Sequence, residues 1–117
     1  MIILCGHGIY GKTLKKSVEM ITGEQPQVRS VDFTMNMAVT DIISNYEQLI
    51  KEAGEEVFIM CDLKGGSPAN AAVLTKRNHP EIRVCTGLNL SMLLSLIMGS
   101  TLEEALYEAK DSIQEIE

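Results

Sequence analysis

The residues best able to do chemistry follow two apolar runs of the chain. His7, flanked by two glycines, comes after Ile2 to Cys5, and Asp62 comes directly after Val57 to Cys61. A neutral imidazole can use one ring nitrogen as a nucleophile while the other donates to a carboxylate, which fixes the tautomer and the ring orientation. If the two runs are neighbouring strands, His7 and Asp62 are expected to form such a pair.

A glycine turn follows Asp62 and offers a place for an anion. Ser67 and Pro68 are typical of the N-cap and first position of a helix. Backbone N–H groups at a helix N-terminus favour phosphate. We therefore expect the N–H groups of Gly65, Gly66 and Ser67, together with the Ser67 hydroxyl, to hold phosphoryl oxygens. Lys64 is expected either to add positive charge at the rim of this anion site or to be a solvated loop residue.

A second interpretation of the first stretch is a nucleotide-binding loop. Gly6 to Thr13 matches the P-loop pattern G-x-x-x-x-G-K-[ST] position for position, and Asp62 could then serve as a magnesium ligand. Helical spacing that begins near Ile9, however, places Lys12 inside a helix on its polar face. A P-loop keeps its lysine at the very start of the helix after a longer loop, and it gives His7 no role.

Length and charge limit the classes of function. The chain has 117 residues, a length that predicts a single domain, residues 1–117. Its net charge is −6. Its ten Lys and Arg residues are scattered, which argues against nucleic acid or an anionic membrane as partner. Without a long apolar span or a secretory signal, the protein is expected to be cytoplasmic. Cys5, Cys61 and Cys85 are expected to be small buried residues.

Strand-like and helix-like segments alternate along the chain. Strands are predicted for the two apolar runs named above and for Val28 to Phe33 and Ile82 to Cys85. Helices are predicted between them and at the C-terminal end. Their signals are Leu14, Val18 and Ile21 before Gly23; Ile42, Tyr46, Leu49, Ile50 and Ala53 before Gly54; Ser67 with Pro68; Asn89 as N-cap before Met92, Leu93, Leu96, Ile97 and Gly99; and the Thr101–Glu104 capping box before Leu102, Ala105, Leu106, Ala109 and Ile113.

This alternation predicts an α/β fold: a single-domain open parallel sheet of strand order 2-1-3-4, with helices on both faces. In that order the first and third strands are neighbours at a topological switch point. Ligands bind open α/β sheets in the crevice outside such a point. His7 and Asp62, at the carboxyl ends of these two strands, are therefore expected to meet there.

Four stretches together resemble the mannose/fructose-type EIIA domain of the bacterial phosphotransferase system. They are Gly6-His7-Gly8, the strand end Val31-Asp32-Phe33, the run from Asp62 to Asn70 (DLKGGSPAN), and Thr86-Gly87-Leu88-Asn89-Leu90. The likeness extends over essentially the whole chain. The motifs occur in order and at the expected intervals, so their combination is specific, whereas Gly-His-Gly alone would be a weak signal.

The resemblance implies a phosphocarrier that uses no metal and no cofactor. His7 matches the histidine that accepts a phosphoryl group from the carrier HPr and passes it to the cognate EIIB subunit during sugar uptake. Asp62 matches the acid that orients this histidine, and Ser67 lies in the phosphate-contacting loop with Gly65 and Gly66. A non-catalytic regulatory module, in which His7 only gates a partner, is a third interpretation.

The resemblance also implies a homodimer. In the mannose-type archetype a C-terminal strand is exchanged between two subunits, and only Ile113 to Ile116 could form a stub of that strand here. We therefore expect any dimer to be weaker or differently built.

Overall fold

The computed structural model of the chain describes residues 1–54 and 56–117, which form one four-stranded parallel sheet and five helices. The strand order is β2-β1-β3-β4, so the predicted order 2-1-3-4 and the α/β class are confirmed. The elements are β1 (Ile2–His7), α1 (Tyr10–Thr22), β2 (Val28–Phe33), α2 (Val39–Ala53), β3 (Phe58–Cys61), α3 (Ser67–Asn78), β4 (Arg83–Cys85), α4 (Leu90–Ile97) and α5 (Leu102–Asp111).

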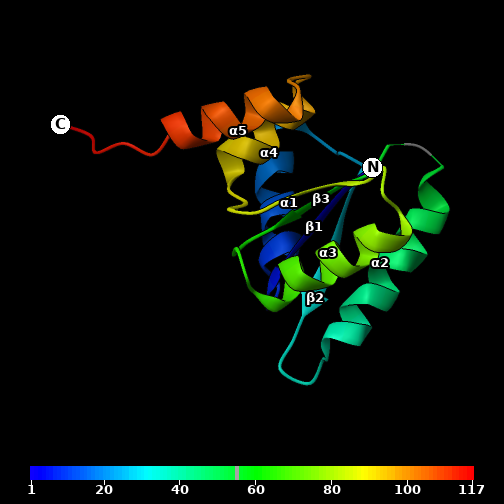
Figure 1. Cartoon of the computed structure of the whole chain (residues 1–117). Coiled ribbons are helices and arrows are strands. Elements are labelled where there is room, and N and C mark those ends of the chain that lie inside the picture. Colours follow the sequence, from blue (N-terminus) through cyan, green and yellow to red (C-terminus); the bar gives the residue numbers. More distant parts are fainter. Residues whose placement is uncertain (55) are drawn as a thin grey trace.

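Helices cover both faces of the sheet, as predicted (Figure 1). Odd-numbered residues of β1, such as Ile3 and Cys5, lie in one core with side chains of α2 and α3. Even-numbered residues, such as Ile2 and Leu4, lie in the other core with α1, α4 and α5. Because both faces of β1 and β3 are covered, these strands are continuous apolar runs rather than alternating ones.

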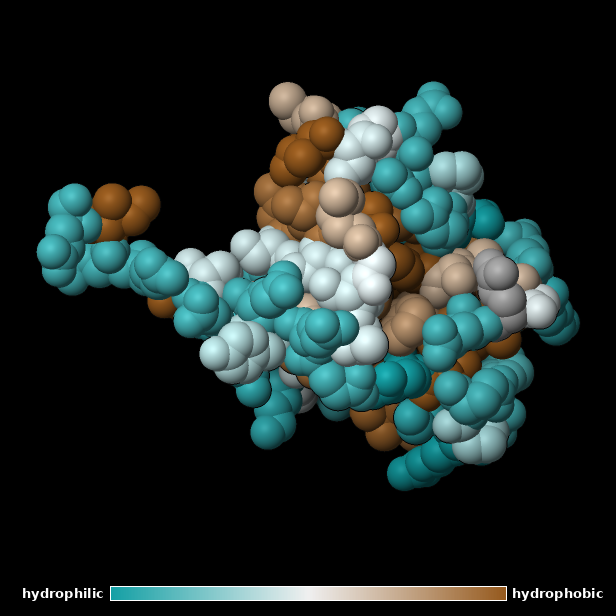
Figure 2. All heavy atoms as spheres, turned by 90° about the horizontal axis from the view of Figure 1, so that it is seen from above, coloured by the Kyte–Doolittle hydropathy of each residue, from teal (hydrophilic) through white to brown (hydrophobic). Residues whose placement is uncertain are grey.

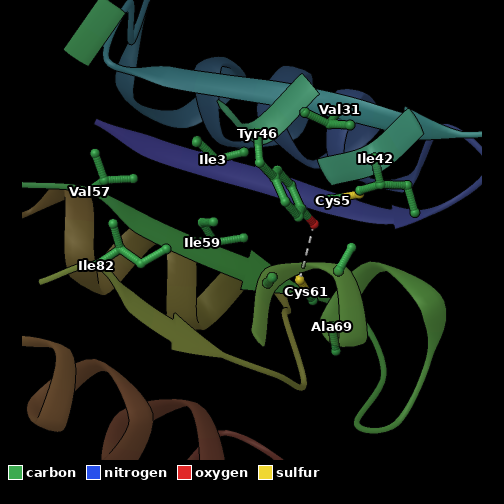
Figure 3. Packing of buried hydrophobic residues seen from close by; sticks show 12 residues of the cluster. Ile3, Cys5, Val31, Ile42, Tyr46, Val57, Ile59, Cys61, Ala69 and Ile82 are labelled. Carbon is green, nitrogen blue, oxygen red and sulfur yellow. Dashed lines mark hydrogen bonds between the residues drawn. The ribbon is translucent and has the colours of Figure 1, made fainter. Parts of the chain in front are cut away.

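Tyr46 of α2 lies at the centre of the first core and is fully buried (Figure 3). Its hydroxyl donates to the Pro68 carbonyl at 3.0 Å and lies 3.6 Å from Cys61 Sγ. Burial raises the pKa of the Cys61 thiol to about 12 and that of Cys5 to about 11. Cys85 is partly buried, and burial raises its pKa to about 11. All three cysteines are free thiols; Cys5 and Cys61 are buried as expected, whereas Cys85 is only partly buried.

Two details of the helices differ from prediction. Ser67 is the first residue of α3 rather than its N-cap, because Gly66 occupies the cap with φ −76° and ψ 166°. Ile113 was expected on the apolar face of the last helix, but α5 ends at Asp111 and Ile113 is 78% exposed. Residues 113–117 form neither helix nor strand, and in Figure 2 this end of the chain extends away from the body of the molecule.

Among the described helices, none combines the length and the apolar character needed to cross a lipid bilayer.

The hydroxyl of Tyr46 gives a testable prediction about stability. Tyr46→Phe removes the hydrogen bond to the Pro68 carbonyl, and we expect the free energy of unfolding to fall by about 1 kcal/mol. Urea unfolding at neutral pH measures the change. The matched control is Tyr107→Phe, since Tyr107 is 73% exposed and its replacement should leave stability unchanged. Equal stability of Tyr46→Phe and the wild type would contradict the assigned role.

Candidate functional site

His7 and Asp62 meet at the carboxyl ends of two adjacent parallel strands. Strand β1 pairs with β3 up to Cys5 and Cys61, so the residues that follow this pair emerge at the same edge of the sheet. His7 Nδ1 lies 2.8 Å from Asp62 Oδ2, and the same oxygen accepts the backbone N–H of His7 at 2.9 Å. The topology thus brings together the two residues that the sequence placed at this edge.

The two side chains differ in exposure. The side chain of His7 is 51% exposed and that of Asp62 is 15% exposed. Burial opposes ionisation of Asp62, but the hydrogen bonds from the backbone and ring of His7 outweigh it and hold the pKa of Asp62 below its ordinary value. An ionised carboxylate held at Nδ1 keeps the proton on that nitrogen. The lone pair is then on Nε2.

Two further residues border the imidazole. Phe33, at the end of β2, presents its ring to His7 edge to face, with centroids 5.6 Å apart and planes at 70°. Gly66 lies on the Cε1 side, where a methyl group added to its Cα would come within 3.0 Å of His7 Cε1. Since Cε1 lies between the two ring nitrogens, this contact places the glycine turn beside the imidazole without singling out Nε2.

Two hydrogen bonds stabilise the turn from Leu63 to Ser67. Gly66 donates its N–H to the Leu63 carbonyl at 3.1 Å, so this N–H of the three expected to bind an anion is used within the turn. The Asn70 side chain donates to the Gly65 carbonyl at 3.2 Å. Gly65 has φ +80°, a left-handed conformation that favours glycine. In the described part of the chain, no backbone carbonyl outside α3 accepts a hydrogen bond from the N–H of Gly65 or of Ser67.

Tyr10 and the loop after β4 border the site on the other side. Tyr10, the first residue of α1, donates its hydroxyl to the Leu88 carbonyl at 2.6 Å. Burial, and secondarily the charge of Asp62, raises the pKa of Tyr10. Asn89 caps α4 by accepting the Met92 N–H at 2.9 Å, as predicted. Neither this role of Tyr10 nor the ring contact of Phe33 was predicted from the sequence, because both depend on tertiary packing.

The structure argues against a P-loop in residues 6–13. Gly6 and His7 belong to β1, and only Gly8 and Ile9 separate it from α1, which leaves no loop long enough to wrap phosphates. The glycine spacing has a packing cause. A methyl group on Gly11 would lie 2.6 Å from the Leu4 carbonyl oxygen, and one on Gly6 would lie 3.0 Å from Asp62 Cγ.

His79, the other histidine of the chain, lies at the C-terminal end of α3. Its Nε2 is 2.7 Å from Glu47 Oε2, so it joins the end of α3 to α2. It makes none of the contacts that define the site around His7.

The contact with Gly66 gives a prediction about geometry. The backbone of Gly66 suits any residue, so Gly66→Ala should keep the fold while its methyl group moves the His7 ring by a few tenths of an ångström. If His7 is the reacting group, its reaction should slow about tenfold because misplacement weakens orientation. Transfer kinetics and thermal unfolding measure the two effects separately. An unchanged rate would contradict the importance of this contact.

The depressed pKa of Asp62 gives a prediction about acid stability. A carboxyl whose pKa is lowered on folding contributes stability above its unfolded pKa, and this contribution is lost as the pH falls through the folded value. The difference in free energy of unfolding between the wild type and Asp62→Asn should therefore shrink as the pH is lowered below the ordinary aspartate value of 3.8. Urea titrations at several pH values test this, and a constant difference would contradict it.

Comparison with known proteins places these features in a family. A family model described as "PTS system fructose IIA component" matches residues 1–114. The chain is 40% identical over 96 residues to the PTS system sorbose-specific EIIA component of Klebsiella pneumoniae, covering 81% of this chain and 70% of that protein. It is 35% identical over 102 residues to the PTS system mannose-specific EIIAB component of Escherichia coli K12, covering 84% of this chain but only 31% of that longer protein.

A solved structure supports the same relationship. The mannose/sorbose specific IIA subunit of the phosphotransferase system from Enterococcus faecalis superposes with a TM-score of 0.92 at 26% identity, covering 99% of this chain and 93% of that chain. The chain belongs to the mannose/fructose/sorbose EIIA family of the sugar phosphotransferase system.

Proposed function

We propose that this domain, residues 1–117, is a phosphocarrier in which His7 accepts a phosphoryl group from HPr and passes it to an EIIB subunit. The observation that carries the proposal is the Asp62 contact at Nδ1, 2.8 Å long, which leaves the exposed side chain with Nε2 available for reaction. Family membership supports a role in a sugar phosphotransferase system. The mannose-specific relative named EIIAB supports EIIB as the acceptor.

The transfer consists of two exchanges of the same kind. The lone pair of His7 Nε2 attacks the phosphorus of the phosphohistidine donor, and a new N–P bond forms as the donor N–P bond breaks. The electron pair of the broken bond returns to the donor imidazole, so nothing is oxidised or reduced. The second exchange repeats these steps, with His7 as donor and the acceptor side chain of EIIB as nucleophile.

The residues around His7 have separate roles in this proposal. Asp62 holds the proton on Nδ1 and balances the positive charge that the ring gains on phosphorylation. The Gly65 and Ser67 N–H groups, with the Ser67 hydroxyl, stabilise the phosphoryl oxygens, and Gly66 leaves room for the ring. Positioned donors of this kind suffice without a bound metal, since the transferring group needs orientation and charge stabilisation.

The test is labelling with phosphoenolpyruvate, enzyme I and HPr. We expect the chain to take up a single phosphoryl group that survives alkali and is lost in acid, as a phosphoramidate is. Addition of an EIIB subunit should remove the label, and EDTA added after the donor HPr has been phosphorylated should not slow this step. Binding of Mg-ATP that depends on Lys12, with no HPr-dependent label, would instead favour a nucleotide-binding function.

A further inference from the structure

A cleft of about 730 Å³ lies along β2, the strand at one end of the sheet. Residues 29–32 of β2 line it, and so do side chains of α1 and α2, which cover opposite faces of the sheet. Neither His7 nor Asp62 lines the cleft. The cleft is therefore separate from the proposed phosphorylation site, and the inference drawn from it does not depend on that proposal.

The outer edge of β2 offers unpaired backbone groups to this cleft. Ile2 donates its N–H to the Gln27 carbonyl at 2.9 Å, which sets the alternation of the ladder between β1 and β2. The backbone N–H and C=O groups of odd-numbered β2 residues then hydrogen-bond to β1, and those of even-numbered residues point away from β1. The N–H of Val28 already donates to the Gln25 carbonyl. The backbone groups of Ser30 and Asp32 are therefore the ones available for another strand.

The α1 wall of the cleft is cationic. Lys12, Lys15 and Lys16 all line it and lie on one side of the helix, since they are three and four positions apart. Within residues 1–54 and 56–117, no ion pair involves any of the three. Three carboxylates, of Glu19, Asp32 and Glu52, line the cleft with the three lysines and Arg29, which leaves an excess of one positive charge. This positive excess is local, because the chain as a whole has a net charge of −6.

The α2 wall is different in character. Arg29, on this side of β2, is paired with Glu52 at 3.1 Å, so its charge is largely balanced. The remaining α2 residues that line the cleft are the amides Asn45 and Gln48 and the partly buried Leu49. A strand lying in the cleft would thus meet lysines on one face and a neutral, partly apolar surface on the other.

We propose that this cleft docks an extended acidic segment of a partner protein, which adds to the sheet as a strand beside β2. Strand addition uses main-chain hydrogen bonds for affinity and alternate side chains for specificity. Because successive side chains of a strand point to opposite faces, the segment carries carboxylates on the side of Lys12, Lys15 and Lys16. Its other side chains are apolar and lie against the wall that contains Leu49.

A synthetic hexapeptide of alternating Glu and Val, labelled with a fluorophore, is the probe. Its anisotropy should rise on titration with the full chain at low salt, and salt should weaken the binding. The combined variant Lys12→Glu, Lys15→Glu, Lys16→Glu should weaken it by about tenfold or more. The matched control is Lys51→Glu, Arg77→Glu, Lys110→Glu, which makes the same charge change outside the cleft and should bind more tightly than the α1 variant.

Two further measurements separate strand addition from nonspecific charge attraction. In the complex, amide exchange should slow at Ser30 and Asp32, and a peptide N-methylated at alternate residues on its pairing edge should not bind. Thermal unfolding checks that the variants are folded. Lys→Gln replacements at the same three positions remove the positive charges without reversing them and serve as a milder test. Equal binding by the methylated peptide, or by both charge-reversed variants, would overturn the proposal. Self-association that the α1 variant abolishes would assign the cleft to a second copy of the chain instead.

Discussion

We expect His7→Ala to abolish phosphoryl labelling completely while leaving the fold intact. His7 is the last residue of β1 and its side chain is 51% exposed, so its removal takes away little packing. In the proposed mechanism Nε2 is the atom that forms the N–P bond, and no neighbouring group can replace it. The measurement is incorporation of label from phosphoenolpyruvate through enzyme I and HPr, with thermal unfolding to check the fold.

Two controls make this experiment specific. His79→Ala removes the other histidine of the chain, at the end of α3, and should still be labelled. Lys12→Ala should also be labelled, because Lys12 lies on the exposed side of α1, and among the described residues no hydrogen bond or ion pair joins it to His7. Retention of label in His7→Ala would show that another residue accepts the phosphoryl group. Loss in Lys12→Ala alone would revive a role for the Gly6 to Thr13 stretch in binding phosphate.

The strand order was predictable because it follows from local patterns and one topological rule. Two continuous apolar runs identified β1 and β3 as strands covered on both faces. The helices predicted between successive strands indicated βαβ units, in which the strands run parallel. The switch point between these strands then predicts from the sequence alone that His7 lies beside Asp62. The contact at 2.8 Å is thus a consequence of the order β2-β1-β3-β4.

The surroundings of His7 were less predictable because they come from tertiary packing. Gly66 was expected to supply a backbone N–H, but its N–H bonds within the turn and its missing side chain makes room for the imidazole. Phe33 belongs to β2, and nothing in a strand pattern indicates that its ring meets His7. The N-cap of α3 was misplaced by one residue, because Gly66 and Ser67 both suit a helix start and only the backbone angles distinguish them.

The C-terminal end shows a different limit of periodicity. Ile113 continues the spacing of the apolar face formed by Leu102, Ala105 and Ala109, so the pattern extends the helix to it. In the structure Ser112 ends that helix and donates its hydroxyl to the Ala109 carbonyl at 2.7 Å. Beyond this point the chain leaves the body, and Ile113 and Ile116 are 78% and 93% exposed. Periodicity shows which side of a helix is apolar, but not whether another element covers it.

Asp62→Asn is expected to slow phosphoryl transfer strongly without abolishing it. In the wild type, Asp62 Oδ2 accepts both the backbone N–H and the Nδ1–H of His7, at 2.9 and 2.8 Å. An asparagine whose oxygen takes the place of Oδ2 still accepts both N–H groups, but this neutral oxygen holds the Nδ1 proton less strongly than a carboxylate, and its amide then lies at the buried Oδ1 position without an acceptor. In the flipped orientation the amide nitrogen lies against the backbone N–H and donates to Nδ1, and the ring then carries its proton on Nε2, which has no lone pair for attack. Loss of the carboxylate also removes the charge that stabilises the phosphorylated imidazole. We expect a fall of about 10²- to 10⁴-fold in the transfer rate.

Rapid-quench transfer from phosphorylated HPr measures this rate, and Asp111→Asn is the matched control because Asp111 is an exposed residue at the end of α5. The pH profile separates a role in the reaction from a role in folding alone. If Asp62 orients and stabilises His7, the asparagine variant should remain slow at every pH at which it is folded. If Asp62 only supports the turn after β3, transfer should recover wherever unfolding measurements show that the variant is fully native. Recovery of the wild-type rate under those conditions would contradict the orienting role and would leave the contact at Nδ1 a structural one.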